Sequence, residues 1–163
     1  MSHAADTPSL DLATPQGLAD AFLHHGVTLA SIKGLDDDDL EALYAVAWAR
    51  LAEGRAHDAV DDLLLLVTHD PWVPRFQFAY GLALQLLGQY EAAARHYAQA
   101  LLMDATDAAC LLRTGECLEQ LGHAAQAEEA LRACIQLSYR RPEDHLVRAH
   151  AQARLRALEG GAP

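Results

Sequence analysis

Basic residues are scarce in this chain. Among its 163 residues, 12 Lys and Arg stand against 23 Asp and Glu, which gives a formal net charge of -11. A protein that binds a phosphate backbone or an anionic membrane surface usually carries an excess of positive charge. The charge balance therefore argues against a nucleic acid partner and against direct membrane binding.

Long apolar runs and a leader segment are also missing. No run reaches the roughly 18 residues that a membrane-spanning helix needs. The first residues, MSHAADTPSLDLATPQ, have neither the basic region nor the apolar region of a secretory signal. The apolar content of 52% suits one globular domain. We therefore expect a cytoplasmic protein.

Patterns typical of a chemical site are absent as well. The three cysteines, Cys110, Cys117 and Cys134, form no CxxC pair and are odd in number, so they indicate neither a disulfide framework nor a zinc ribbon. The sequence has no HExxH, no Gly-rich phosphate loop and no GxSxG. The acidic run at 36–39 precedes a helical pattern, where carboxylates cap free N–H groups. We predict no metal, no cofactor and no enzymatic activity.

A repeat of 34 residues organises the chain. Gly54, Gly88 and Gly122 share this spacing, and with units that begin at 40, 74 and 108 the eighth position is small while the twenty-fourth is large. These two positions hold Ala47, Gly81 and Gly115, and Leu63, Tyr97 and Leu131. A small residue lets two helices cross closely, and a large one fills the space beside the crossing.

Each unit therefore predicts two helices joined by a Gly-containing turn, which is the tetratricopeptide pattern. The expected fold class is all-α, with three tetratricopeptide repeats at 40–73, 74–107 and 108–141 that form a short curved solenoid. An N-terminal helical segment at 14–39 comes before them, and a capping helix at 142–158 covers the open end. Residues 1–13 are predicted to be a disordered tail and residues 159–163 a second tail.

The first helices of such units line a concave groove. Positions two, five, nine and twelve of each first helix are expected to point into it, and the middle of the groove is then apolar. The predicted peptide-binding residues are Tyr44, Trp48, Leu51, Arg75, Phe78, Leu82, Gln85, Leu112 and Glu116. An exposed cluster of this kind indicates a partner. The alternative is that the N-terminal helix folds over Tyr44 and Trp48 and makes them core.

The groove is poor in the basic residues that would clamp an acidic tail. Only Arg75 and Arg113 are basic among the positions that a carboxylate clamp would use. We therefore expect the ligand to be an extended apolar peptide.

Residues 26–48, GVTLASIKGLDDDDLEALYAVAW, resemble the segment that leads into the first repeat of the type III secretion class II chaperones, the tetratricopeptide chaperones of translocator proteins. The resemblance continues through 69–104 and 114–131, and it extends over the range 18–158. It implies a non-enzymatic chaperone in the cytoplasm of a Gram-negative bacterium, which keeps hydrophobic, pore-forming translocators soluble.

The resemblance also implies how partners are bound. An N-terminal stretch of the translocator would lie extended in the groove against Tyr44, Trp48, Leu51, Phe78 and Leu82. A homodimer would form through the N-terminal helix, which assigns Phe22, Leu29 and Ile32 to the dimer interface. Some members of the family also assist a transcriptional activator. A generic tetratricopeptide scaffold, which organises an assembly without protecting a client, is the alternative function.

Overall fold

Helix pairs make up most of this protein, whose computed structural model describes residues 14–24 and 27–160. The elements in these ranges are α1 (Pro15–His24), α2 (Leu29–Lys33), α3 (Asp37–Ala52), α4 (Ala56–His69), α5 (Pro74–Leu86), α6 (Tyr90–Met103), α7 (Ala108–Gln120), α8 (Ala124–Ser138), the 3₁₀ turn η1 (Pro142–Asp144) and α9 (His145–Gly160). No strand occurs among the described residues. The all-α prediction is confirmed.

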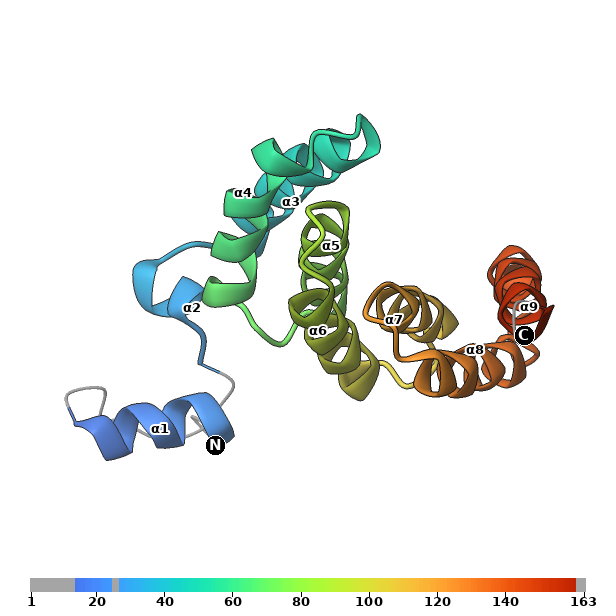
Figure 1. Cartoon of the computed structure of the whole chain (residues 1–163). Coiled ribbons are helices and arrows are strands. Elements are labelled where there is room, and N and C mark those ends of the chain that lie inside the picture. Colours follow the sequence, from blue (N-terminus) through green and yellow to red (C-terminus); the bar gives the residue numbers. More distant parts are fainter. Residues whose placement is uncertain (1–13, 25–26, 161–163) are drawn as a thin grey trace.

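The pairs α3–α4, α5–α6 and α7–α8 stack side by side into an arc. Figure 1 shows α3, α5 and α7 on the inner side of this arc and α4, α6 and α8 on the outer side. Helix α3 contacts α5, and α5 contacts α7, so the first helices of successive units are neighbours. A continuous inner surface results, as a stack of helical repeats requires.

A glycine with positive φ closes the first helix of each pair. The φ angles of Gly54, Gly88 and Gly122 are 76°, 77° and 77°. After α5, the Gly88 N–H donates to the carbonyl oxygen of Gln85 at 3.0 Å, and the Gln89 N–H donates to that of Leu84 at 2.9 Å. These bonds satisfy the last carbonyls of the helix, and the left-handed conformation they need favours glycine.

Within the second and third pairs, a glycine faces a large side chain. A Cβ atom added at Gly81 would lie 3.0 Å from Tyr97 Cε1, and one added at Gly115 would lie 2.9 Å from Leu131 Cδ2. Tyr97 and Leu131 are fully buried. The eighth and twenty-fourth positions of the repeat therefore meet at the helix crossing.

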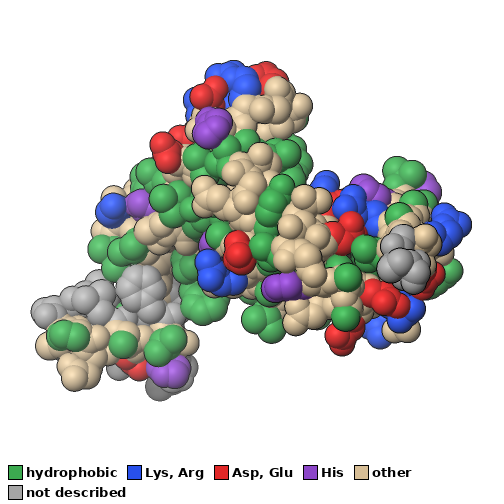
Figure 2. All heavy atoms as spheres, in the orientation of Figure 1, with side chains coloured by type: hydrophobic (Ala, Val, Ile, Leu, Met, Phe, Trp, Pro, Cys, Tyr) green, Lys and Arg blue, Asp and Glu red, His purple; other side chains and the backbone are tan. Residues whose placement is uncertain are grey.

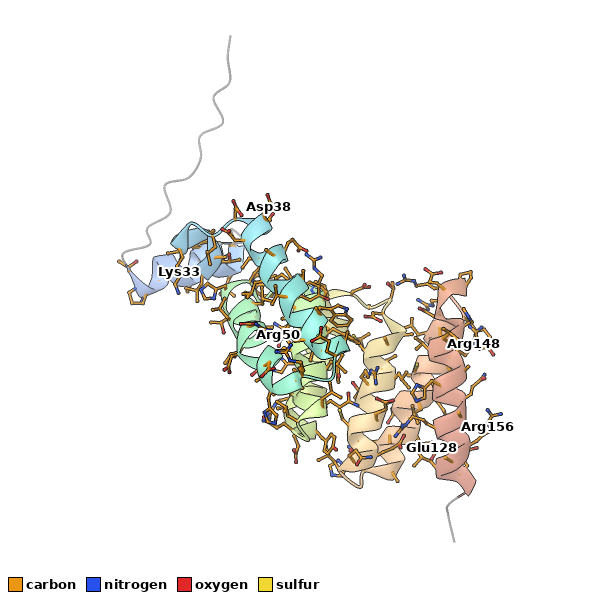
Figure 3. All side chains as sticks on the ribbon, turned by 90° about the horizontal axis from the view of Figure 1, so that it is seen from above. Lys33, Asp38, Arg50, Glu128, Arg148 and Arg156 are labelled. Carbon is orange, nitrogen blue, oxygen red and sulfur yellow. The ribbon has the colours of Figure 1, made fainter. Side chains whose placement is uncertain are left out.

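The two ends of the arc are closed differently. At the C-terminal end, α9 packs Val147, Ala151, Leu155 and Leu158 against the core of α7 and α8. Helix α9 ends at Gly160, two residues beyond the predicted 158, and the predicted tail residues 1–13 and 161–163 lie outside the described part of the chain. At the other end, α2 packs against α4. Figure 3 shows Lys33 of α2 and Arg148 of α9 at these opposite ends.

Candidate peptide-binding groove

An aromatic stack lies on α3, the first of the inner helices. The rings of Tyr44 and Trp48, one turn apart on α3, are stacked with centroids 6.0 Å apart and an interplanar angle of 24°. The Tyr44 ring also lies 5.4 Å from that of Phe76 on α5. Trp48 remains 40% exposed, while Tyr44 is partly buried and its burial raises the pKa of its hydroxyl. The stack offers an apolar surface to a ligand.

Arg75, the second residue of α5, joins this stack to α3. Its guanidinium carbon lies 5.3 Å from the ring centroid of Tyr44 and 5.3 Å from that of Phe76. The same guanidinium forms an ion pair with Glu41 on α3. Cations are attracted to the faces of aromatic rings, so the orientation of Arg75 is set by contacts on two sides.

Two hollows open beside Arg75, near the N-terminal ends of α3, α5 and α7. The first encloses about 300 Å³ and is lined by Asp37, Leu40, Glu41, Asp70, Val73, Arg75 and Phe76. The second encloses about 350 Å³ and is lined by Val73, Pro74, Arg75, Phe78, Asp104 and Asp107. Arg75 and Val73 belong to both linings. Each hollow has the size of a site for one or two side chains and is lined by apolar side chains together with carboxylates.

The middle of the inner surface is formed by partly buried residues of α5. The Phe78 ring lies 5.3 Å from that of Tyr97, and Leu82 packs partly buried against the core that α3, α4 and α5 share. The Tyr97 hydroxyl donates a hydrogen bond of 2.7 Å to Gln85 Oε1, and burial raises the pKa of this hydroxyl.

A polar cluster lies at the C-terminal ends of α5 and α7. Glu116, 6% exposed, accepts hydrogen bonds of 2.9 Å from Gln85 Nε2 and from Arg113 Nη1. On α9, Arg154 Nη1 lies 3.7 Å and His150 Nε2 3.5 Å from its other carboxylate oxygen. A hollow of about 360 Å³ opens here, lined by Gln85, Leu86, Tyr90, Glu116, Gln120 and Arg154.

The contribution of α9 to this cluster was not foreseen from the sequence. Arg154 binds Glu119 with two hydrogen bonds, from Nε at 3.0 Å and from Nη2 at 2.7 Å. Figure 2 shows side chains of both charge signs gathered over the α8 and α9 end of the molecule. No spacing in the sequence relates α9 to α7. The presence of Arg154 on a helix that is expected to cap the repeats is the one sequence signal for this contact.

Two of the predicted groove residues lie in the core. Leu51, 7% exposed, belongs to the same core cluster as Leu63 and Ala59 of α4, because the turn at Gly54 folds α4 back onto the end of α3. Leu112, 4% exposed, lies in the cluster that α8 and α9 cover. Their role in peptide binding stays a prediction.

The predicted dimer residues lie in α1 and α2. Leu29 is partly buried and Ile32 is 43% exposed. Phe22 lies in α1, but its side chain is outside the described part of the structure. An interface through these residues stays a prediction.

The three cysteines are buried in the described part of the chain. Cys110, Cys117 and Cys134 are buried, and burial raises the pKa of the Cys117 and Cys134 thiols to about 11. Across residues 14–24 and 27–160, no three His, Cys, Asp or Glu side chains are grouped so that they could hold a metal ion. In the same ranges, every helix is too short or too polar to cross a bilayer.

The helix pairs and the hollowed inner surface define a helical-repeat protein with a groove suited to an extended peptide. A family model described as Tetratricopeptide repeat matches residues 109–138. A second, described as Bacterial transcriptional activator domain, matches residues 15–106, more than half of the chain, so α1 to α6 belong to that domain family. These descriptions name domains, whereas full-length relatives identify the protein family.

Two relatives match most of the chain. The Low calcium response locus protein H of Yersinia pseudotuberculosis is 29% identical over 157 residues, which cover 96% of this chain and 90% of the relative. The Chaperone protein SicA of Salmonella typhimurium is 31% identical over 134 residues, which cover 82% of this chain and 79% of the relative.

Two solved structures share the fold. PcrH from Pseudomonas aeruginosa, in complex with the chaperone binding region of PopD, has a TM-score of 0.75 and 31% identity over 78% of this chain and 96% of that chain. The type III secretion chaperone SycD of Yersinia enterocolitica, in complex with a peptide of the translocator YopD, has a TM-score of 0.72 and 29% identity over 77% of this chain and 95% of that chain. This chain belongs to the type III secretion class II chaperones, as the resemblance predicted.

Proposed function

We propose that this protein is a cytoplasmic chaperone that binds an extended apolar segment of a type III secretion translocator along α3, α5 and α7. The observation that carries the proposal is the stacked Tyr44 and Trp48 pair, which leaves an indole 40% exposed on α3, the first of the inner helices. Aromatic side chains in a groove are the usual anchors of a bound partner. The complexes of PcrH with a region of PopD and of SycD with a YopD peptide support the same kind of ligand.

The physical demands of the client agree with this role. A pore-forming translocator has apolar segments that insert into membranes and aggregate in water. A preformed groove that binds a short extended segment does not require the client to fold. The client can then be released stepwise when the secretion machinery pulls on it. No catalytic step is needed, which fits a non-enzymatic carrier.

A homodimer is part of the proposal. SycD has been solved in a form described as an alternative dimer. The exposed Ile32 and the partly buried Leu29 on α2, together with Phe22 of α1, are the residues that we assign to the corresponding contact. Ile32→Asp is expected to shift the protein toward monomer in sedimentation at equal concentration.

Co-expression with the translocators of the same secretion system tests the main proposal. We expect the wild-type protein to keep a co-expressed translocator soluble and to pull it down. Trp48→Glu, which places a charge on the aromatic stack, is expected to abolish the complex and to leave helicity and thermal unfolding nearly unchanged. A large loss of folding would instead mean that Trp48 supports the core.

Trp72 provides a matched control for this substitution. It is 54% exposed in the connection between α4 and α5 and lines neither hollow beside Arg75. Trp72→Glu adds the same charge at an exposed tryptophan and is expected to keep the complex. If neither the wild type nor this control holds a translocator in solution, the chaperone proposal fails and a scaffold function is favoured.

A further inference from the structure

Among the described residues that line the two hollows, Arg75 is the one with a side-chain hydrogen-bond donor. The other described residues in the two linings are either apolar or carboxylates. The carboxylates are Asp37, Glu41, Asp70, Asp104 and Asp107. Ionised carboxylates only accept hydrogen bonds, whereas a guanidinium carries five N–H donors. A ligand carbonyl group at this place therefore finds its side-chain donor in Arg75.

The guanidinium of Arg75 is already held in place and still has unused donors. Glu41 pairs with it from α3, and the rings of Tyr44 and Phe76 lie 5.3 Å from its carbon. One carboxylate accepts at most two of the five N–H groups in a bidentate pair. The Arg75 side chain is 50% exposed, so part of it is open to a ligand. A fixed donor loses little conformational freedom when a ligand binds.

An extended client segment brings acceptors that need such a donor. The main-chain carbonyls of an extended segment accept no hydrogen bonds from the segment itself. When its apolar side chains enter the hollows, the neighbouring carbonyls lose contact with water. An unpaired carbonyl that loses its water weakens binding. A client carboxylate is a poorer partner for Arg75, because five carboxylates of the two linings would repel it.

Building on the proposed function, we propose that Arg75 recognises the main chain of the client. Its guanidinium donates a hydrogen bond to the carbonyl oxygen that lies between two client side chains, one entering each hollow. Arg75 thus sets the register in which the apolar segment lies along α3 and α5. Glu41, Tyr44 and Phe76 are positioning residues that orient the guanidinium.

Peptide binding can test this assignment directly. The probe is the tightest-binding member of a set of overlapping 12-residue synthetic peptides that cover the co-expressed translocator, titrated against the full-length protein by fluorescence anisotropy. Arg75→Met keeps an unbranched stem similar to that of arginine and removes the guanidinium with its donors. We expect it to weaken binding about tenfold to a hundredfold, as the loss of a hydrogen bond to a charged group does.

Ester substitution in the peptide separates recognition from a structural role. Replacing one amide by an ester weakens one carbonyl as an acceptor and also removes one N–H donor, so each position of the peptide is replaced in turn and its effect is compared between the two proteins. For the wild type we expect a loss of about tenfold at the position that faces Arg75. For Arg75→Met the ester at that position is expected to cause a smaller loss, because the guanidinium donor is gone, while the other esters act equally on both proteins. Leu102→Met, at an 86% exposed side chain of α6, serves as the control variant.

Three results would overturn the inference. Binding by Arg75→Met at wild-type affinity would show that the guanidinium is not used. Ester effects that are the same in both proteins at every position would show that Arg75 acts only by holding α3 and α5 together through Glu41. If the wild type binds none of the peptides, the proposed function itself fails and this inference falls with it, whereas binding with either of the first two results leaves the proposed function standing.

Discussion

Glu116 shows how a single buried charge can be accommodated on the inner surface. Its side chain is 7% exposed, and four cationic or polar partners reach it from α5, α7 and α9. A buried carboxylate without partners would be strongly destabilising. The Gln85 side chain, which donates to Glu116, also accepts a hydrogen bond of 2.7 Å from the Tyr97 hydroxyl. Residues that shape the groove are therefore coupled to the helix crossing beneath it.

Gly81 is the residue at which this crossing is tightest in the second pair. Gly81→Leu is expected to destabilise the protein by about 1–3 kcal/mol, because an overpacked core must shift its neighbours. Even the Cβ atom would lie 3.1 Å from Tyr97 Cδ1 and 3.3 Å from the carbonyl oxygen of Ala93. Urea unfolding measures the change. Gly160→Leu, where a Cβ atom meets open space, is the control, and equal stability of both variants would contradict the observed packing.

The buried thiols make a prediction about reactivity and pH. Burial raises the pKa of Cys117 and Cys134 from 9.0 to about 11, so their reactive thiolate forms are suppressed near neutral pH. We expect iodoacetamide at pH 8 to leave all three cysteines unmodified in the folded protein and to modify them in urea. Mass spectrometry counts the adducts.

The same pKa shifts imply a loss of stability at high pH. Between pH 9 and about 11 the unfolded chain releases thiol protons that the folded chain retains. The free energy of unfolding therefore falls as the pH rises through this range. Rapid alkylation of the native protein, or a stability that does not change across this pH range, would contradict the burial of these side chains.

At the scale of elements, α9 acts as the last wall of the groove as well as the cap of the third pair. Ala151 is fully buried against α7 and α8, and Arg154 holds Glu119 on the neighbouring α7. The side chains of Arg154 and Glu119 are 29% and 16% exposed, so their pair is better shielded from water than a typical surface ion pair.

This shielding predicts a measurable coupling between α9 and α7. In a double-mutant cycle of Arg154→Ala and Glu119→Ala, we expect a coupling free energy of about 1 kcal/mol, at the upper end for exposed pairs. Urea unfolding of the four proteins provides the measurement. Arg156→Ala on the same helix, for which the structure records no ion pair, should change stability little. A coupling near zero would mean that apolar contacts alone dock α9.

The parts of the fold that could be predicted from the sequence are the helix pairs, because their residues recur with a fixed spacing. Gly54, Gly88 and Gly122 mark the turns, and small residues such as Gly81 face large ones such as Tyr97, because both features follow from the geometry of a helix pair. The polar cluster around Glu116 was not predictable in the same way. Its partners on α9 come from outside the repeat, and no period relates them to α7.

Burial of the groove residues also needed the structure. The spacing on α3 placed Leu51 on the inner face, but it lies near the turn, where α4 folds over it. Leu112 is likewise covered because α9 closes the third pair. The position of a residue in a helix predicts the direction in which its side chain points. Its exposure depends on whether another helix or turn covers that side of the helix.

For the molecule as a whole, the arc predicts that local stability differs between the middle helices and the ends. It also predicts that a bound client protects the inner helices more than the outer ones. Helices α5 and α6 have neighbours on both sides, while α1 lies at the free end of the arc (Figure 1). In a stack of repeats, stability comes from contacts between adjacent units. We therefore expect amide hydrogen exchange to be slowest in α5 and α6 and fastest in α1.

Addition of a bound translocator segment should change this exchange pattern on one side only. Because the inner surface consists of α3, α5 and α7, we expect added protection to concentrate in these helices. Helices α4, α6 and α8, on the outer side of the arc, should change less. Exchange followed by mass spectrometry on the purified complex and on the free protein measures the difference. Protection that rises equally in the outer helices would place the client on the convex surface and remove the basis for the roles assigned to Trp48 and Arg75.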